Sequence, residues 1–338
     1  MIKMVEKSGN IKKEGSEKKK MWNKRGMQIA VLVCLSLLLS PLVGTAQTTG
    51  DTVTYQNQEL IAYPNTVKPI VDNPGLYPHT VIIDTRKSED YNSSHIPGAI
   101  NIYDGNFKYP GNSTLIPVEE VTGILGDKGI NESNEVIIYG KPYHYMFWML
   151  EYLGHNDVSV LDGGFENWNT TYPDNVTNIT TPPRSSTTYT ATLIEDRIAT
   201  TPWLFENYEN PDVQIVDVRT EGEYNGTVIK PGTIRGGHIP GAYLLDFNEL
   251  WEEDHEMKSA GKLSDLFSHS AVDSKGEIVS LNKSKDIVVH CYSGGRASSM
   301  YFALRLMNYT VRNYEESMKV WYNNLSLPVE AQSDSLVI

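Results

Sequence analysis

A repeat constrains the fold of this chain more than any other feature. The segment Val81-Ile-Ile-Asp84-Thr-Arg86 leads to His95-Ile-Pro-Gly-Ala99, and Gln214-Ile-Val-Asp217-Val-Arg219 leads to His238-Ile-Pro-Gly-Ala242. Each copy continues with a short β-branched run and a stretch of helical character, and ends near a tryptophan. Short apolar runs that alternate with helical stretches are typical of parallel sheets covered by helices on both faces. The pattern predicts an α/β fold built from two such units.

The repeat also sets the expected domain boundaries. One copy covers residues 55–171 and the other covers residues 193–330. The stretch between them, residues 172–192, is rich in Thr, Ser, Pro and Asn and has little apolar content, so it is predicted to be an extended linker. A chain of 338 residues is long enough for two domains of ordinary size.

The first 46 residues have the order of a targeting segment. A basic patch is followed by an apolar run over residues 27–39 and by small residues before position 46. This order is typical of a signal peptide, although residues 27–46 are also nearly long enough to act as an N-terminal membrane anchor. Both alternatives predict an exported protein, located outside the cell, in the cell envelope or in a periplasm-like space. Ten of the 25 asparagines lie in the Asn-x-Ser/Thr acceptor pattern, which favours a secreted glycoprotein.

Charge and cysteine content exclude several classes of partner and cofactor. The net charge is −13, and it becomes −19 without residues 1–46, which hold nine Lys/Arg and three Glu. Such a surface repels a phosphate backbone, so no nucleic-acid partner is expected. The two cysteines, Cys34 in the apolar run and Cys291, are too few for a disulfide scaffold or a four-cysteine zinc site. We find no metal or organic cofactor motif.

The loop after the apolar run 286–290 carries the chemistry. It reads Cys291-Tyr-Ser-Gly-Gly-Arg296 and leads into a helical stretch. A strand here would deliver Cys291 to the carboxyl edge of a parallel sheet, where ligands bind in open α/β folds. Gly294 and Gly295 allow the backbone N–H groups to turn inward, and the following helix adds its positive end. We therefore expect a stabilised thiolate, with Arg296 binding the oxygens of an anion.

These motifs together resemble the rhodanese homology domain. Asp-x-Arg after a strand, His-Ile-Pro-Gly-Ala downstream and Cys-x-x-Gly-x-Arg before a helix are its features, and two copies over residues 55–330 resemble the tandem thiosulfate and 3-mercaptopyruvate sulfurtransferases. The resemblance implies that the first copy is inactive, because Gly140 stands at its cysteine position, and that the second is catalytic. It implies Cys291 and Arg296 as catalytic residues; Tyr292, Ser293, Gly294, Gly295, Ala297 and Arg235 as substrate-binding residues; and Asp217, Arg219 and His238 as structural residues.

The activity implied is transfer of sulfane sulfur through a Cys291 persulfide. The donor would be thiosulfate or a related compound, and the acceptor a thiophile such as cyanide or a thiol. Two positions depart from thiosulfate-type enzymes: Glu223 replaces a second substrate arginine, and Tyr292 replaces a cation after the cysteine. The alternatives are a non-catalytic persulfide carrier, sensor or binding protein of the cell envelope, and a cysteine phosphatase, whose Cys-x5-Arg loop is longer. The oligomeric state is not predicted.

Overall fold

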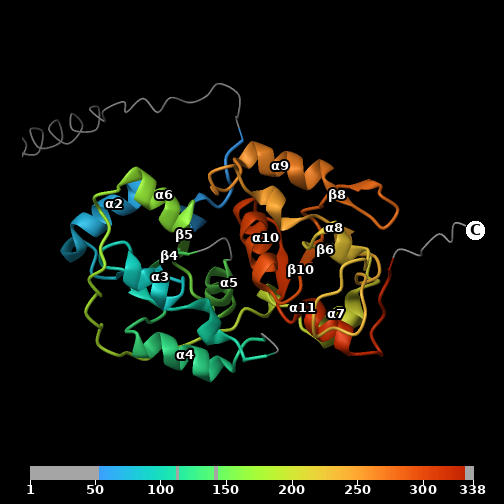
Figure 1. Ribbon diagram of the computed structural model, residues 1–338, viewed down its shortest axis with the longest axis horizontal. Coiled ribbons are helices and arrows are strands. Elements are labelled where there is room, and N and C mark those ends of the chain that lie inside the picture. Colours follow the sequence, from blue (N-terminus) through green and yellow to red (C-terminus); the bar gives the residue numbers. More distant parts are fainter. Residues whose placement is uncertain (1–52, 112–113, 141–143, 332–338) are drawn as a thin grey trace, which may run out of the picture. The chain divides into compact units, whose positions relative to one another are not determined.

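A computed structural model describes residues 53–111, 114–140 and 144–331. The expected targeting segment 1–46, with its possible anchor 27–46 and Cys34, lies outside the described residues. Within the described part of the chain, no helix is long and apolar enough to cross a membrane. Both copies of the repeat belong to one compact unit, Asp51–Ile338 (Figure 1).

The first copy folds around a parallel five-stranded sheet. Its strand order is β1-β5-β4-β2-β3, and every neighbouring pair is parallel. The strands are β1 (Ile61–Ala62), β2 (Thr80–Asp84), β3 (Ile100–Asn101), β4 (Glu135–Tyr139) and β5 (Val158–Leu161). The α-helices are α2 (Pro64–Asp72), α3 (Ser88–Ser93), α4 (Val118–Asp127), α5 (Tyr145–Tyr152) and α6 (Gly164–Thr171), with 3-10 turns η1 (Gln58–Leu60), η2 (Pro74–Leu76) and η3 (Asp104–Phe107).

The second copy has the same parallel core with an added edge. Its strand order is β11-β10-β6-β7-β8-β9. The strands are β6 (Val213–Asp217), β7 (Tyr243–Leu244), β8 (Ala271–Val272), β9 (Ile278–Val279), β10 (Asp286–His290) and β11 (Val311–Tyr314). The helices are α7 (Thr201–Asn207), α8 (Glu221–Tyr224), α9 (Ala260–His269), α10 (Gly295–Leu306) and α11 (Ser317–Asn323), with 3-10 turns η4 (Glu195–Arg197) and η5 (Phe247–Leu250).

The predicted α/β fold with two tandem domains is confirmed, with one difference at the edge of the second sheet. The strands β8 and β9 pair antiparallel with their neighbours. They are joined by a tight turn in which Gly276 N donates to Asp273 O and Gly276 has φ +81°. A connection this short allows only antiparallel pairing, whereas a parallel pair needs a crossover of a dozen residues or more.

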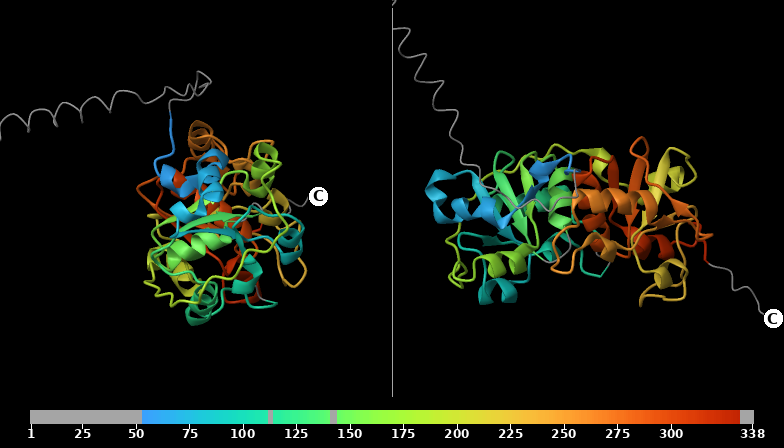
Figure 2. Two further views of the ribbon diagram at one scale, coloured as in Figure 1. Left: turned by 90° about the vertical axis from the view of Figure 1, so that its left-hand side faces the viewer. Right: turned by 90° about the horizontal axis from the view of Figure 1, so that it is seen from above.

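Both faces of each sheet are covered by helices (Figure 2). Alternate residues of a strand point to opposite faces, and along β2 Val81 and Ile83 enter one hydrophobic cluster while Ile82 enters another. The first of these clusters runs through both copies, because α5 and α10 pack against each other between the two sheets. All eight residues of α5 are buried, as expected of a helix whose residues are apolar or aromatic on every side apart from Glu151. A shared core therefore joins the two copies.

The predicted linker, residues 172–192, is extended and contacts the first copy. Thr187 N donates to Gly126 O at 2.9 Å, and Thr192 N donates to Leu153 O at 3.0 Å. A Cβ atom at Gly126 would lie 2.4 Å from Thr187 O, so this close approach requires glycine. The linker is thereby held against the first copy along its length.

Candidate active site

The loop that carries Cys291 joins a buried strand to a buried helix. The strand β10 ends at His290, and α10 begins at Gly295. Gly294 has φ +79°, and a Cβ atom there would lie 2.8 Å from Glu315 O. The turn therefore requires glycine at this position for two reasons, its backbone conformation and its close contact with the segment after β11.

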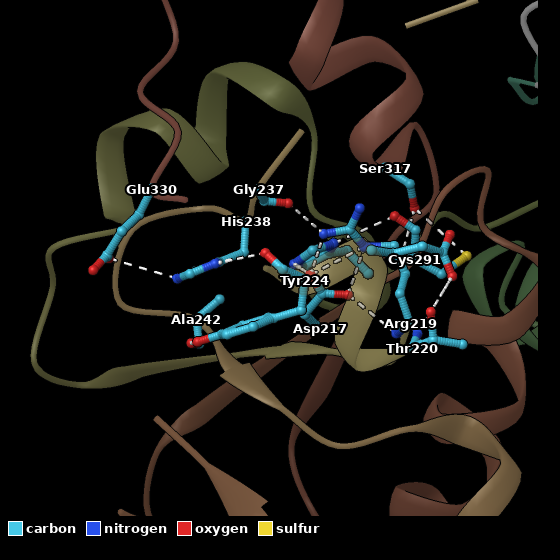
Figure 3. Close-up of polar contacts among 12 residues, drawn as sticks. Asp217, Arg219, Thr220, Tyr224, Gly237, His238, Ala242, Cys291, Ser317 and Glu330 are labelled. Carbon is cyan, nitrogen blue, oxygen red and sulfur yellow. Dashed lines mark hydrogen bonds and ion pairs between the residues drawn. The ribbon is translucent and has the colours of Figure 1, made fainter. Parts of the chain in front are cut away.

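The Cys291 thiol is almost completely buried and lies beside a serine (Figure 3). Its residue is 2% exposed, and Sγ lies 4.0 Å from Ser317 Oγ. That hydroxyl accepts hydrogen bonds from Cys291 N at 3.1 Å and Gly294 N at 3.2 Å, and it lies 2.7 Å from Tyr314 O, to which it can donate. Ser317 has φ +54°, a strained conformation for a residue other than glycine.

The backbone N–H groups of the loop, which the sequence predicts to turn inward, thus fall into two sets. The N–H groups of Cys291 and Gly294 are occupied by the Ser317 hydroxyl. The N–H groups of Tyr292, Ser293, Gly295 and Arg296 have no acceptor among the described residues. This second set, together with the positive end of α10, is available to an anion at the loop.

Arg296 binds a carboxylate instead of standing free for a substrate. Its Nη1 and Nη2 donate to the two oxygens of Glu223 at 2.7 and 2.8 Å. Burial works against the charge of Arg296, but the hydrogen bonds that it donates to Glu223, together with the negative charges of Cys291 and Glu223, outweigh burial and raise the pKa of the guanidinium. The same pairing lowers the pKa of Glu223, although burial alone would raise it. The donor fork of Arg296 is thus occupied by Glu223 in this structure, and its contact with anion oxygens stays a prediction.

The Asp-x-Arg motif forms a buried ion pair beneath the loop (Figure 3). The oxygens of Asp217 accept bonds from Arg219 Nε, Nη2 and backbone N. Arg219 also donates to Tyr322 Oη at 2.8 Å and to Gly237 O at 2.7 Å. His290, directly before Cys291, has Nε2 3.8 Å from Asp217, and burial lowers its pKa to about 4. These contacts fix the carboxyl end of the sheet under the loop.

The two repeat histidines lie in the turns where the sequence places them. His238 Nδ1 lies 3.0 Å from Tyr224 O, and the ring stacks on Tyr224 at 3.7 Å. His95 repeats this arrangement with Tyr91, at 2.7 Å and 3.8 Å. Burial lowers the pKa of His238, which favours the neutral imidazole. Both histidines have the contacts of structural turn residues.

The remaining predicted binding residues fall into two groups. Tyr292 and Ser293 are half-exposed on the loop, with Tyr292 Oη donating to Pro231 O at 2.9 Å, whereas Ala297 is buried in the first turn of α10. Arg235 donates to three backbone carbonyls at the end of α11, Trp321 O, Tyr322 O and Asn324 O. These bonds close the end of that helix, and a role of Arg235 in substrate binding stays a prediction.

The first copy has no room for a cysteine at the equivalent position. A Cβ atom on Gly140 would lie 2.0 Å from Thr85 Oγ1. The counterpart of Ser317 is Gly164, which has φ +59° and no hydroxyl. Residues 141–143, which follow Gly140, lie outside the described residues. The described part of this loop thus lacks both the thiol and the serine that accompanies it.

Sequence reasoning missed Ser317 and a polar cluster from the first copy. The alignment of the two copies could have pointed to Ser317, because it replaces Gly164 at a position where the backbone has a positive φ. Lys108, after η3, donates to Ser293 O at 3.2 Å across 185 residues of sequence, and no local pattern indicates that contact. Close to it, burial raises the pKa of Glu315 and of Asp104 to about 7 each.

Comparison with protein families now decides the classification. The family model described as "Rhodanese-like domain" matches residues 67–171 and 200–324, which together exceed half of the chain. The chain belongs to the rhodanese-like domain family. The first matched segment contains β2 to β5 and the second contains β6 to β11, with Cys291 in the second.

Similar curated proteins include thiosulfate sulfurtransferases and a sulfur carrier protein. The chain is 28% identical over 292 residues to a thiosulfate sulfurtransferase of Corynebacterium glutamicum, covering 82% of this chain and 92% of that protein. It is 29% identical to a putative thiosulfate sulfurtransferase of Haloferax volcanii, covering 77% and 90%. It is also 29% identical to the sulfur carrier protein TtuD of Thermus thermophilus, covering 71% and 86%. The family and these relatives support an enzyme of the sulfurtransferase type.

Solved structures share the fold at low sequence identity. The wild-type structure of EanB aligns with a TM-score of 0.71 at 22% identity, covering 81% of this chain and 69% of that chain. The crystal structure of YnjE aligns with a TM-score of 0.70 at 20% identity, covering 81% and 68%. These likenesses concern the tandem arrangement of the fold.

Proposed function

We propose that this protein transfers sulfane sulfur from thiosulfate, or a related anionic donor, to a thiol or cyanide through a persulfide on Cys291. The observation that carries the proposal is the position of the Cys291 thiol, at a strand-to-helix turn whose neighbouring amides lack acceptors within the described residues. Two relatives named thiosulfate sulfurtransferase support the donor.

The reaction has two displacement steps. In the first, the Cys291 thiolate attacks the outer sulfur of thiosulfate; a bond forms between Sγ and that sulfur, the sulfur–sulfur bond of the donor breaks, and sulfite leaves with the bonding electron pair. In the second, the acceptor attacks the outer sulfur of the persulfide, and the thiolate of Cys291 is regenerated. Sulfite is a stable anion, so the first step needs little acid catalysis.

The loop contributes mainly electrostatic stabilisation. The N–H groups of Tyr292, Ser293, Gly295 and Arg296 have no acceptor among the described residues, so they and the positive end of α10 can stabilise negative charge held at the loop. Arg296 is tied to Glu223, so it acts by fixing the loop against α8. A donor must contact Sγ in order to react, and the 2% exposure of Cys291 means that a neighbouring group has to move aside first.

The test is a thiocyanate-forming assay with thiosulfate and cyanide. The full chain is expected to produce thiocyanate with parallel lines in double-reciprocal plots, and Cys291→Ser is expected to remove the activity without lowering the melting temperature. Retained turnover in the Cys291→Ser variant would refute the proposal.

A persulfide carrier is the second candidate, and one observation favours it. The similar protein of Thermus thermophilus is named a sulfur carrier protein. A carrier would hold the persulfide and release it slowly to cyanide but rapidly to a protein thiol. Single-turnover measurements with a loaded chain and both acceptors separate the two candidates.

We further propose that the protein is exported and glycosylated. The support is the order of residues 1–46 and the ten acceptor patterns. Nine of these asparagines are described, and each is exposed or half-buried (Asn92, Asn131, Asn169, Asn175, Asn178, Asn225, Asn282, Asn308 and Asn324). The test is the mass of the protein isolated from its own cells. We expect it to show that the N-terminal segment has been removed, or is retained as an anchor, and that glycans are attached. An unmodified mass in the cytosolic fraction would contradict both parts.

A further inference from the structure

A lysine of the first copy reaches the loop of the second. Lys108 caps the turn η3, and its Nζ donates to Ser293 O, within the Cys291 loop, at 3.2 Å. The ammonium lies 3.7 Å from the centre of the Tyr145 ring, a cation–π contact with a side chain that is 1% exposed. The head group is therefore held in place by one residue from each copy.

The charged groups around this ammonium come from five elements. Asp104 lies in η3, Tyr145 in α5, Glu315 after β11 and Lys319 in α11, while the Cys291 thiol lies after β10. Glu315 is itself fixed across the two copies, because Oε1 accepts a bond from Leu115 N at 3.0 Å and Oε2 lies 3.4 Å from Tyr145 Oη. Arg296, His290 and Asp217 are further ionisable groups near the loop.

Arg296 and Lys108 differ in how their positive charge is compensated. Arg296 is neutralised by a bidentate contact with Glu223. Lys108 donates one hydrogen bond to a neutral carbonyl and makes no ion pair within 4.0 Å among the described residues. Burial lowers the pKa of Lys108, and the negative charges of Glu315 and Cys291 oppose this lowering.

We propose that Lys108 is a positioning and charge-supplying residue of the Cys291 site: it holds the Ser293 carbonyl and supplies the positive charge that favours the thiolate and an incoming anionic sulfur donor. The first copy, although it lacks a cysteine at the equivalent position, is then part of the active site. Lys108 also takes the place of the cation that is missing at Tyr292, next to the cysteine. This inference rests on Cys291 being the nucleophile of the proposed function.

The test compares two alkylating agents at Cys291. Iodoacetate is anionic and iodoacetamide is neutral, and both react with the same thiolate. The rates are measured on the Cys291 peptide of the full chain by mass spectrometry, which separates this thiol from Cys34. In Lys108→Met we expect the pH of half-maximal iodoacetamide alkylation to rise by about one unit, with a rate about tenfold lower at neutral pH. We expect the ratio of iodoacetate to iodoacetamide rates to fall as well.

Two further variants separate charge from structure. Lys108→Arg keeps the charge and is expected to restore most of the iodoacetate to iodoacetamide ratio. Glu315→Gln removes a competing negative charge and is expected to raise that ratio. Lys68→Met removes a half-buried lysine of α2 that pairs with Asp72 and lies over the Tyr172 ring, and it serves as the control that leaves both rates unchanged.

The outcome that overturns the inference is specific. If Lys108→Met slows both reagents equally at every pH, or leaves both unchanged, Lys108 does not supply charge to the site. If Lys108→Met and Glu315→Gln change the ratio in the same direction, the charge argument also fails. None of these outcomes decides the proposed sulfur transfer, which fails if Cys291→Ser remains active.

Discussion

Replacement of Ser317 tests how the loop around Cys291 is held. The hydroxyl accepts bonds from Cys291 N and Gly294 N, and Ser317 is fully buried. Ser317→Ala leaves both amides without this acceptor. Each buried donor without a partner costs about 1–3 kcal/mol, so the variant is expected to lose about 3 kcal/mol of unfolding free energy.

Ser317→Gly provides the matched comparison. It removes the same hydroxyl but also relieves a left-handed backbone at φ +54°, which costs a non-glycine residue roughly 1–2 kcal/mol. The glycine variant is therefore expected to be about 1 kcal/mol more stable than the alanine variant. Ser298→Ala is the control, because its buried hydroxyl donates one bond, to Gly295 O. Its expected loss is about 1 kcal/mol.

The assay is urea denaturation followed by tryptophan fluorescence, with the three variants and the wild type at the same pH. The expected order of stability is wild type, then Ser298→Ala, then Ser317→Gly, with Ser317→Ala lowest. An alanine variant that is as stable as the glycine variant would show that the backbone at Ser317 is not strained. An alanine variant as stable as Ser298→Ala would show that the two amide contacts contribute little.

Three further variants test other contacts of the site. Pairing with Arg296 lowers the pKa of Glu223, so the carboxylate stabilises the fold at pH values above its ordinary pKa of 4.5, and this stability is lost as the pH falls below that value. Glu223→Gln is therefore expected to be less stable at neutral pH. Its melting curves are also expected to lack this acid-dependent loss of stability. Glu151→Ala removes the partly buried carboxylate that lies 2.9 Å from Arg305, and it is expected to lower the free energy of unfolding in urea by about 3 kcal/mol. A loss below about 0.5 kcal/mol would mean that this ion pair does not hold the two copies together. Arg235→Ala is expected to lower the melting temperature by a few degrees with an unchanged KM for thiosulfate, and a raised KM would return Arg235 to the binding site.

The repeat alone predicts most of the fold, because its motifs act locally. Asp217 and Arg219 bond to each other two residues apart, and His238 bonds to the backbone of its own domain. The alternation of apolar residues along β2 and β10 gives two covered faces. The short antiparallel edge formed by β8 and β9 was not predicted, since two-residue strands have no periodicity to detect.

The site was predicted less completely, because its key contacts join distant segments. The pairing of Arg296 with Glu223 spans 73 residues, and the contact of Lys108 with Ser293 spans 185. Glu223 is visible in the sequence as a departure from thiosulfate-type enzymes, but only the fold shows that it neutralises Arg296. Ser317 stands where the first copy has glycine. The importance of this difference follows from the backbone, because Ser317 has a φ of +54°, a conformation that glycine adopts more readily.

The most direct test of sulfur transfer is the mass of the Cys291 peptide after the full chain has been incubated with thiosulfate and freed of excess donor. We predict that this peptide gains the mass of a single sulfur atom, that sulfite is released in equal amount, and that cyanide removes the added mass as thiocyanate. Thiocyanate formation without any added mass on Cys291, or with the added sulfur on another residue, would contradict the role of Cys291 as the sulfur carrier.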